Sequence, residues 1–170
     1  MTEEVTNSSI AEQKTNSITN TNEENLNSFD MISKSPKIES ISKNKETWYV
    51  KIQSIGLQAE ISEGTSTETM NQYVGHFEES SKTNGIVGLA AHNRGYPKNY
   101  FENLKKLKVG DEIQYHYKDF EKKYIVESHT IIKDTDWSWL EPKDENRIVL
   151  ITCVENEPEY RRCIQGVEKN

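Results

Sequence analysis

Three side chains that together can carry out acyl transfer stand at or near the ends of apolar runs in this chain. Cys153 follows the run 148–151, Arg161 comes shortly after it, and His92 directly follows the run 86–91. A thiolate is the nucleophilic form of cysteine, and a histidine can take the thiol proton and later deliver it to a leaving amine. An arginine is always charged and can stabilise the oxyanion of a tetrahedral intermediate. If the three groups meet, the chain cuts or joins peptide bonds through a thioester.

The neighbours of these residues leave two alternatives open. Arg162 directly follows Arg161, and on a strand the two side chains point to opposite faces, so only one of them can face a site. Cys153 and Cys163 are the two cysteines of the chain, and they could instead form one disulfide or be inert small hydrophobic residues. The remaining histidines have no special context and are interpreted as surface or structural residues: His76, His116 and His129.

Composition divides the chain into two parts. Of its 170 residues, 33% are hydrophobic, against roughly 45–50% in a typical globular domain on a count that includes Gly. The deficit is concentrated in the first part of the chain, which is rich in Ser, Thr, Asn, Glu and Lys. Such a segment cannot bury enough apolar surface to offset its ordering entropy. We therefore predict a flexible linker over residues 1–45 and one folded domain over residues 46–170, which is long enough for a real core.

Charge and hydropathy exclude several function classes. The net charge is −7 and no basic stripe interleaves with aromatic residues, so nucleic acid is not expected as a partner. No apolar run is long enough to span a membrane, and the N-terminus lacks the apolar segment of a signal peptide. Neither cysteine lies in a Cys-x-x-Cys motif, which argues against a zinc site. We expect no metal and no cofactor.

The segments that position the three groups have the pattern of short strands separated by turns. Residues 48–55 alternate between apolar and polar and end at Gly56, whereas 85–91 is a continuous apolar run typical of a strand buried on both faces. Near-helical apolar spacing predicts one short helix over 99–107. Further strands are expected over 112–117, 123–133, 147–154 and 161–168, the last two joined by the acidic stretch 155–159. About seven or eight short strands with one or two short helices favour a mostly β fold, either a closed or nearly closed barrel or a sandwich.

Taken in this order, the residues resemble the sortase family, the Gram-positive cysteine transpeptidases. Four segments carry the resemblance, which covers roughly residues 48–168. Leu89–His92 is similar to the end of the family's histidine strand, and Tyr100–Ile113 to the helix-to-strand segment that follows it. Leu150–Cys153 is similar to the family's Thr-Cys motif, and Arg161–Gly166 resembles its arginine strand. The combination is far more specific than any one segment.

The resemblance implies an eight-stranded β-barrel and a Cys–His–Arg site. Cys153 would be the nucleophile that attacks the Thr–Gly bond of an LPXTG-like sorting signal, His92 the general acid and base, and Arg161 the group that orients the substrate and stabilises the oxyanion. Arg161 rather than Arg162 matches the family's spacing to the cysteine and to Gly166. Thr152 would help to shape the oxyanion region as a substrate-binding residue. An amine from a cell-wall precursor or a pilin lysine would then resolve the acyl-enzyme.

The resemblance also bears on class, metal and location. Val74–Phe77 and residues 85–95 look most like class D or class A, and the aspartate-aromatic lid motif of the pilin-polymerising class is not evident. Some members bind calcium near the loop before the cysteine strand; Glu141, Asp144 and Glu145 lie there, and we interpret them as a solvated acidic loop. The family implies an extracytoplasmic protein, associated with the membrane through an anchor upstream of this chain.

Two other functions remain open from the sequence. One is a caspase-like cysteine protease, in which the histidine also precedes the cysteine by roughly fifty residues, although the signature around the cysteine of that class is absent here. The other is a non-catalytic β-barrel binding module with a Cys153–Cys163 disulfide.

Overall fold

The structure is a computed structural model that describes residues 47–170. The linker predicted over residues 1–45 lies outside the described residues. Within residues 47–170, no helix is long and apolar enough to cross a membrane.

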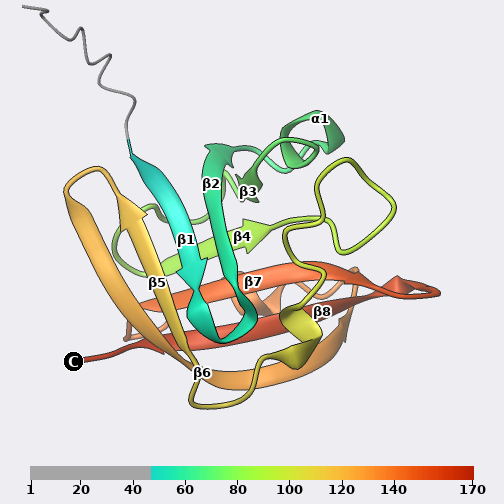
Figure 1. The fold of residues 1–170 in the computed structure, drawn as a ribbon. Coiled ribbons are helices and arrows are strands. Elements are labelled where there is room, and N and C mark those ends of the chain that lie inside the picture. Colours follow the sequence, from blue (N-terminus) through green and yellow to red (C-terminus); the bar gives the residue numbers. More distant parts are fainter. Residues whose placement is uncertain (1–46) are drawn as a thin grey trace, which may run out of the picture. The chain divides into compact units, whose positions relative to one another are not determined.

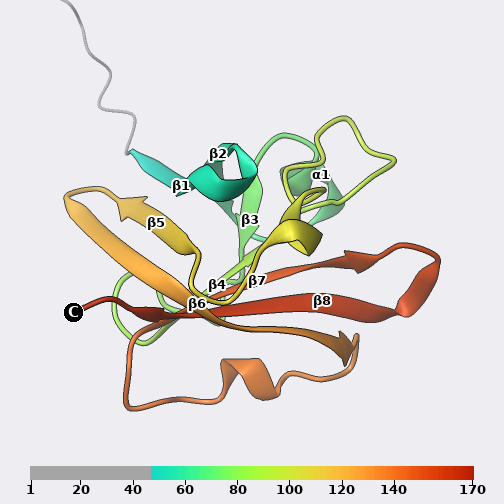
Figure 2. The same ribbon diagram turned by 60° about the horizontal axis from the view of Figure 1, so that its bottom comes forward.

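Eight strands form a closed barrel in the order β1-β2-β3-β4-β7-β8-β6-β5 (Figures 1 and 2). The strands are β1 (Trp48–Ile52), β2 (Leu57–Glu63), β3 (Val74–His76), β4 (Ile86–Ala90), β5 (Glu112–Tyr117), β6 (Phe120–Lys133), β7 (Arg147–Val154) and β8 (Glu157–Glu168). Most neighbours are antiparallel, but β2 pairs with β3 and β4 pairs with β7 in parallel. The prediction of a mostly β, eight-stranded barrel with few short helices is confirmed.

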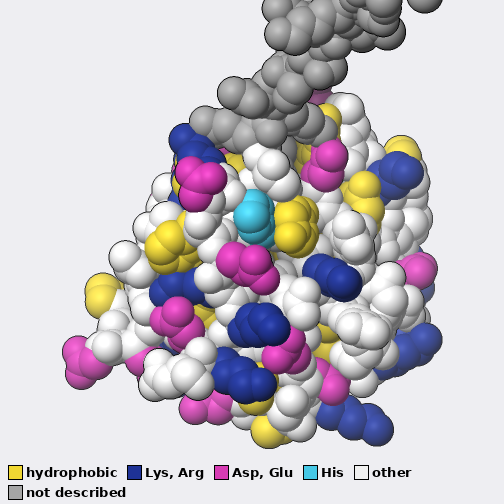
Figure 3. All heavy atoms as spheres, turned by 60° about the vertical axis from the view of Figure 1, so that its left-hand side comes forward, with side chains coloured by type: hydrophobic (Ala, Val, Ile, Leu, Met, Phe, Trp, Pro, Cys, Tyr) yellow, Lys and Arg dark blue, Asp and Glu magenta, His cyan; other side chains and the backbone are white. Residues whose placement is uncertain are grey.

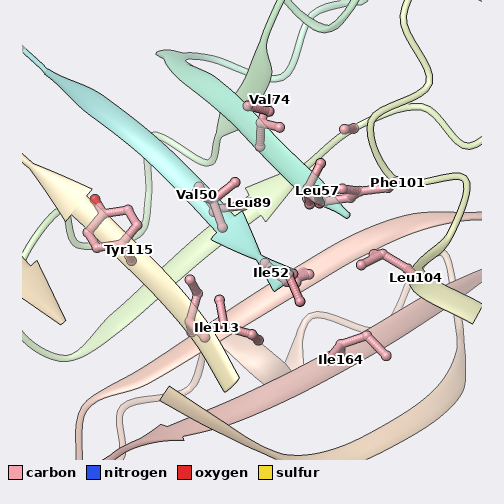
Figure 4. Close-up of a cluster of buried hydrophobic side chains, with 14 of the residues drawn as sticks. Val50, Ile52, Leu57, Val74, Leu89, Phe101, Leu104, Ile113, Tyr115 and Ile164 are labelled. Carbon is pink, nitrogen blue, oxygen red and sulfur yellow. The ribbon is translucent and has the colours of Figure 1, made fainter. Parts of the chain in front are cut away.

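Alternation of apolar and polar residues builds the barrel interior. In β2 the side chains of Leu57, Ala59 and Ile61 are buried, whereas the intervening Gln58 and Glu60 are exposed. Successive side chains of a strand point to opposite faces, so one face of β2 enters the core. Figure 4 shows Leu57 of β2 among buried side chains of other elements, such as Ile52 and Phe101, in the interior of the barrel.

A second, smaller core lies outside the barrel, against β4 and β7. It consists of Ile86, Trp139, Val149, Ile151 and Cys163. Trp139 belongs to the 3₁₀ helix Ser138–Leu140 in the connection between β6 and β7, and Figure 2 shows this connection running across the outer side of β7 and β8. Because one core covers each face, every residue of β4 is buried, as the apolar run predicts.

Three predicted boundaries differ from the structure. The first strand ends at Ile52, because the chain turns through the 3₁₀ helix Gln53–Ile55 into Gly56, whose φ of +66° is a left-handed conformation that glycine adopts readily. The helix predicted over 99–107 is only the 3₁₀ turn Leu104–Lys106; the apolar spacing there reflects burial of an irregular loop. β8 begins at Glu157, so a tight turn at 155–156 replaces the acidic connection predicted over 155–159.

The remaining helix, α1 (Thr67–Met70), lies in the connection from β2 to β3, and the Ser66 hydroxyl accepts a hydrogen bond from the backbone N–H of Thr69 at its start. On the face shown in Figure 3, basic and acidic side chains are interspersed. Ion pairs join neighbouring strands, such as Lys123 of β6 with Glu112 of β5 at 3.7 Å.

Candidate active site

β7 and β8 place Cys153 and Arg161 directly opposite each other in their antiparallel register. Side chains of directly opposed residues stand on the same face of a sheet. The thiol and the guanidinium group of this pair therefore emerge on one side. Arg162 is opposite Thr152 and points to the other face.

The parallel pairing of β4 and β7 brings His92 to the same place. The register pairs Ala90 with Ile151, so His92 and Cys153 each lie two positions beyond that pair. Two side-chain hydrogen bonds fix the alignment past the ends of the ladder. The Thr152 hydroxyl donates to Ala91 O at 2.7 Å, and Asn93 Nδ2 donates to Cys153 O at 2.7 Å.

One pocket of about 230 Å³ unites the four residues that the sequence singled out: His92, Thr152, Cys153 and Arg161. An aromatic wall flanks it, formed by Phe77, Trp137 and Trp139. Phe77 packs edge-on against Trp139, with ring centroids 4.8 Å apart, and against Trp137 at 6.0 Å. Three charged residues also line the pocket: Lys133, Asp134 and Asp136.

The imidazole and the thiol have different environments. Cys153 is exposed, whereas only 7% of His92 is exposed. His92 Nε2 is buried and has no hydrogen-bond partner among the described residues. Burial disfavours the imidazolium form and lowers the pKa of His92. The lowered pKa favours the neutral imidazole, which is the form that can accept a proton.

The two arginines are held by different partners. Arg161 Nη1 donates to Pro158 O at 2.6 Å and to Tyr160 O at 2.8 Å, while its Nη2 lies 3.8 Å from Asp134 Oδ2. These contacts hold the guanidinium group at the rim of the pocket. Arg162 points to the other face of the sheet, where it contacts His129.

Arg162 Nη1 donates to His129 Nε2 at 2.5 Å, and His129 Nδ1 lies 3.0 Å from Leu107 O. A carbonyl oxygen can only accept, so Nδ1 of His129 carries the proton and Nε2 accepts from the arginine. Arg162 and His129 thus form a hydrogen-bonded pair, and neither residue lines the pocket. This placement favours Arg161 as the site arginine.

Both cysteines are free. Cys163 is opposite Ile151 and so is diagonal to Cys153 on the same face. Diagonal residues of an antiparallel pair have Cα atoms about 7–8 Å apart, beyond the roughly 4.4–6.8 Å that a disulfide spans. Cys163 is fully buried in the outer core, and burial raises the pKa of its thiol to about 11. The disulfide-bridged alternative does not match this geometry.

Sequence reasoning missed the aromatic wall and one stacking partner of His92. Trp137 and Trp139 fall in the segment 134–146, for which the sequence predicts a loop or a short helical turn, and the structure has the 3₁₀ helix Ser138–Leu140 there. Two tryptophans in a short polar connection are the signal that could have indicated the wall. The stacking partner is Tyr96, whose ring lies flat against that of His92. Nothing in the residue pattern pointed to it.

In the acidic loop before β7, Glu141 and Asp144 are exposed, and Glu145 forms an ion pair with Arg147. Glu145 accepts hydrogen bonds from Arg147, and Arg147 Nη1 also donates to Glu127 Oε2 at 2.6 Å. Within residues 47–170, no group of three or more His, Cys, Asp or Glu side chains is arranged to hold a metal ion.

Known proteins are similar to this chain in sequence and in fold. A family model described as the sortase domain matches residues 50–168. The lid mutant of sortase C1 from Streptococcus agalactiae is 26% identical, with a TM-score of 0.68 over 74% of this chain and 71% of that one. Sortase C-1 from Streptococcus pneumoniae is 25% identical, with a TM-score of 0.69 over 74% of this chain and 67% of that one.

Similarity of fold extends to a second sortase class. A lid mutant of sortase A from Corynebacterium diphtheriae is 23% identical, with a TM-score of 0.68 over 73% of this chain and 70% of that one. A search of curated protein sequences finds no match.

Proposed function

The chain belongs to the sortase family of cysteine transpeptidases, and from this membership we propose that it cleaves an LPXTG-like sorting signal between Thr and Gly and transfers the acyl product to an amine. One observation carries the proposal: His92, Cys153 and Arg161 arrive from three strands and line a single pocket. The neutral histidine, the exposed thiol and the fixed guanidinium group supply a base, a nucleophile and an oxyanion partner.

In the first half of the reaction, Cys153 Sγ attacks the carbonyl carbon of the Thr in the signal, and His92 takes the thiol proton. The carbonyl oxygen becomes an oxyanion, which Arg161 stabilises. The C–N bond to Gly then breaks, and His92 gives its proton to the departing amine. The product is a thioester between Cys153 and the Thr carbonyl.

In the second half, an amine attacks the thioester carbon and loses a proton to His92. The C–S bond breaks and Cys153 leaves as a thiol, with the proton returned by His92. The acceptors we propose are an amine of a cell-wall precursor or a pilin lysine, and the donor is a surface protein or pilin that carries the signal.

We propose that Thr152 affects the substrate by positioning the catalytic groups rather than by contacting it. It lines the pocket but is only 4% exposed, and its hydroxyl is committed to Ala91 O. It therefore holds the ends of β4 and β7 in register, which sets the separation of the imidazole and the thiol. The aromatic wall, with Trp137 half exposed, is suited to an apolar side chain of the signal.

We also propose a class and a location for the protein. The two structures described as sortase C and the one described as sortase A support the family without separating its classes. We keep class D or class A as our proposal, since no aspartate-aromatic lid motif stands out in the sequence. Sortases work outside the cytoplasm in association with the membrane, and we propose the same for this protein.

The test is mass spectrometry of products formed from a panel of LPXTG-type peptides and amines. Wild-type protein is expected to give a product joined at Thr to the amine, and Cys153→Ala to give none while retaining the fold. Cys163→Ala is the matched control and is expected to keep turnover, because the Cys163 thiol is fully buried and does not line the pocket. Cleavage by Cys153→Ala would overturn the nucleophile assignment, and hydrolysis at another residue type would favour a protease.

A further inference from the structure

The aromatic ring of Tyr96 covers one face of the His92 imidazole. The two ring centroids are 3.5 Å apart and the ring planes differ by 6°. Tyr96 itself is 46% exposed, whereas His92 is 7% exposed. Tyr96 thus stands between the imidazole and solvent.

The backbone of Tyr96 is clamped by one side chain. Asn99 Oδ1 accepts from the Tyr96 N–H at 3.3 Å, and Asn99 Nδ2 donates to Tyr96 O at 2.9 Å. Gly95, with φ of +76°, turns the chain into this clamp. Phe101 N donates to His92 O at 3.0 Å and closes the loop behind it. The position of the tyrosine ring is therefore built into the loop.

A flat stack acts on a histidine in two ways. It removes water from a face of the ring, which disfavours the charged form. It also opposes rotation about the bond that joins the ring to the backbone, because a turned imidazole would collide with the tyrosine. The stack occupies a face of the ring and makes no hydrogen bond to its nitrogens, and the buried Nε2 remains without a hydrogen-bond partner among the described residues. A hydrophobic residue elsewhere in the core could not do both.

We propose that Tyr96 is a positioning residue for the transpeptidase reaction, holding the His92 ring in one plane and shielded from water so that it serves as the proton acceptor for Cys153. The inference rests on the proposed function for its catalytic consequence. Its effect on the imidazole does not depend on that function. Burial already lowers the pKa of His92, which agrees with this role.

Other ionisable groups also affect the protonation of His92, because they line the same pocket. The ionisable groups that line it are Cys153, Arg161, Lys133, Asp134 and Asp136. The charges of Arg161 and Lys133 oppose protonation of the imidazole, and those of Asp134 and Asp136 favour it. Variants at Tyr96 leave all of them in place, so a change in His92 titration reports on the stack alone.

Two variants and one control separate stacking from the hydroxyl and from general effects. Tyr96→Ala removes the stack, and Tyr96→Phe keeps the ring. Tyr49→Ala removes a similar stack between Tyr49 of β1 and His116 of β5, which do not line the pocket. Their ring centroids are 4.9 Å apart and their ring planes differ by 9°. The readouts are NMR titration of the His92 ring proton and the pH profile of kcat/KM for peptide transfer.

Tyr96→Ala is expected to raise the midpoint of His92 titration and to lower kcat/KM by about tenfold or more, with a larger loss at pH 6 than at pH 8. Tyr96→Phe is expected to restore both values, and Tyr49→Ala to change neither. An unchanged His92 titration in Tyr96→Ala, or an equal loss in Tyr96→Phe, would overturn the proposal. A shifted titration in a protein that transfers no peptide would uphold the stack and instead reject the proposed function.

Discussion

At the scale of single residues, adjacent arginines illustrate how a strand separates two roles. Arg161 shares a face with Cys153, while Arg162 shares the opposite face with Thr152 and bonds to His129. The sequence alone predicts that only one of them faces a site. The register of β7 and β8 favours Arg161, because it is the arginine directly opposite the thiol.

Arg161→Ala and Arg162→Ala, compared side by side, test that assignment. Removing an oxyanion partner typically costs about 10²–10³ in kcat, so Arg161→Ala is expected to lose activity on this scale with little change in KM. Arg162→Ala is expected to lose stability, because it leaves His129 without its donor, but to keep kcat. Steady-state kinetics and thermal unfolding of both variants separate the two effects. A larger kcat loss in Arg162→Ala would transfer the role to that residue.

The two cysteines are expected to react at very different rates in the folded protein. Cys153 is exposed, whereas Cys163 is fully buried and its pKa is raised to about 11. At pH 8 native protein should take up one alkyl group from iodoacetamide, at Cys153, and a second only after unfolding. Peptide mapping by mass spectrometry gives the positions. Rapid labelling of Cys163 in native protein would contradict its burial.

At the scale of elements, a polar cluster joins β2 and β3 to the loop before β4. His76 is fully buried; its Nδ1 lies 2.7 Å from Glu63 Oε1, and its Nε2 lies 3.1 Å from Ser81 O and 3.0 Å from Ser80 Oγ. Lys82 forms an ion pair with Glu63 and lies 5.4 Å from the Trp48 ring. The cluster ties down the loop that leads into the histidine strand.

Glu63→Gln is expected to weaken this cluster and to make the unfolding free energy less dependent on pH in the acid range. Burial acts to raise the pKa of Glu63, but hydrogen bonds from Lys82 and His76 outweigh it, so the pKa is lowered. A lowered carboxyl pKa contributes stability above its unfolded value and loses it as pH falls through the folded value. The Glu63 side chain is 36% exposed, so solvent screens its ion pairs. The variant should therefore lose about 1 kcal/mol or less of unfolding free energy at pH 7, and the difference in unfolding free energy from wild type should narrow below pH 4.5, the ordinary pKa of the carboxyl group. Urea unfolding at both pH values measures this, and a constant gap would contradict it.

Gly88 of β4 permits the aromatic wall to approach the sheet. A Cβ added there would lie 3.0 Å from Trp139 Cζ3 and 3.2 Å from Phe77 Cδ2. Gly88→Ala is expected to displace both rings, costing about 1–3 kcal/mol and raising KM for the peptide. Gly166→Ala is the matched comparison, since its Cβ would press on Ile148 and Tyr124 inside the barrel. Gly166→Ala should destabilise the fold without changing KM for the peptide. An equal KM in the Gly88→Ala and Gly166→Ala variants would show that the aromatic wall does not bind the signal.

At the scale of the whole molecule, local patterns predicted more than long-range pairings did. Alternation and apolar runs located most strands, including β4 with both faces buried. They could not reveal that β4 pairs in parallel with β7, because that pairing joins segments far apart in sequence. The pairing nevertheless decides that His92 reaches Cys153. The motif resemblance predicted the shared site, and the register supplies its geometry.

The misses have a common physical origin in irregular segments. Apolar spacing suggested a helix over 99–107, but the side chains of Phe101, Leu104 and Leu107 are buried from a loop and a single 3₁₀ turn. The tight β7–β8 turn depends on Asn156 at φ of +63°, a conformation that asparagine tolerates better than most residues. The acidic composition of residues 155–159 suggested a connection, although residues 157–159 belong to β8.

The extent of the barrel yields a prediction for the chain as a unit. Within residues 47–170, the eight strands from Trp48 to Glu168 already close into a complete barrel, and this barrel carries the candidate pocket. A fragment of residues 47–170 is therefore expected to unfold cooperatively with a Tm within about 2 °C of the full chain. Its kcat/KM on a sorting peptide should agree within about twofold.

Calorimetry and peptide kinetics on the fragment and the full chain measure both quantities. Cys153→Ala in each background provides the inactive control, so that residual cleavage by contaminants is subtracted equally. A fragment that unfolds like the full chain but turns over more than about tenfold more slowly would show that residues before 47 contribute to catalysis. A broad, early unfolding transition would instead show that they contribute to the fold, since loss of a packed partner lowers Tm directly.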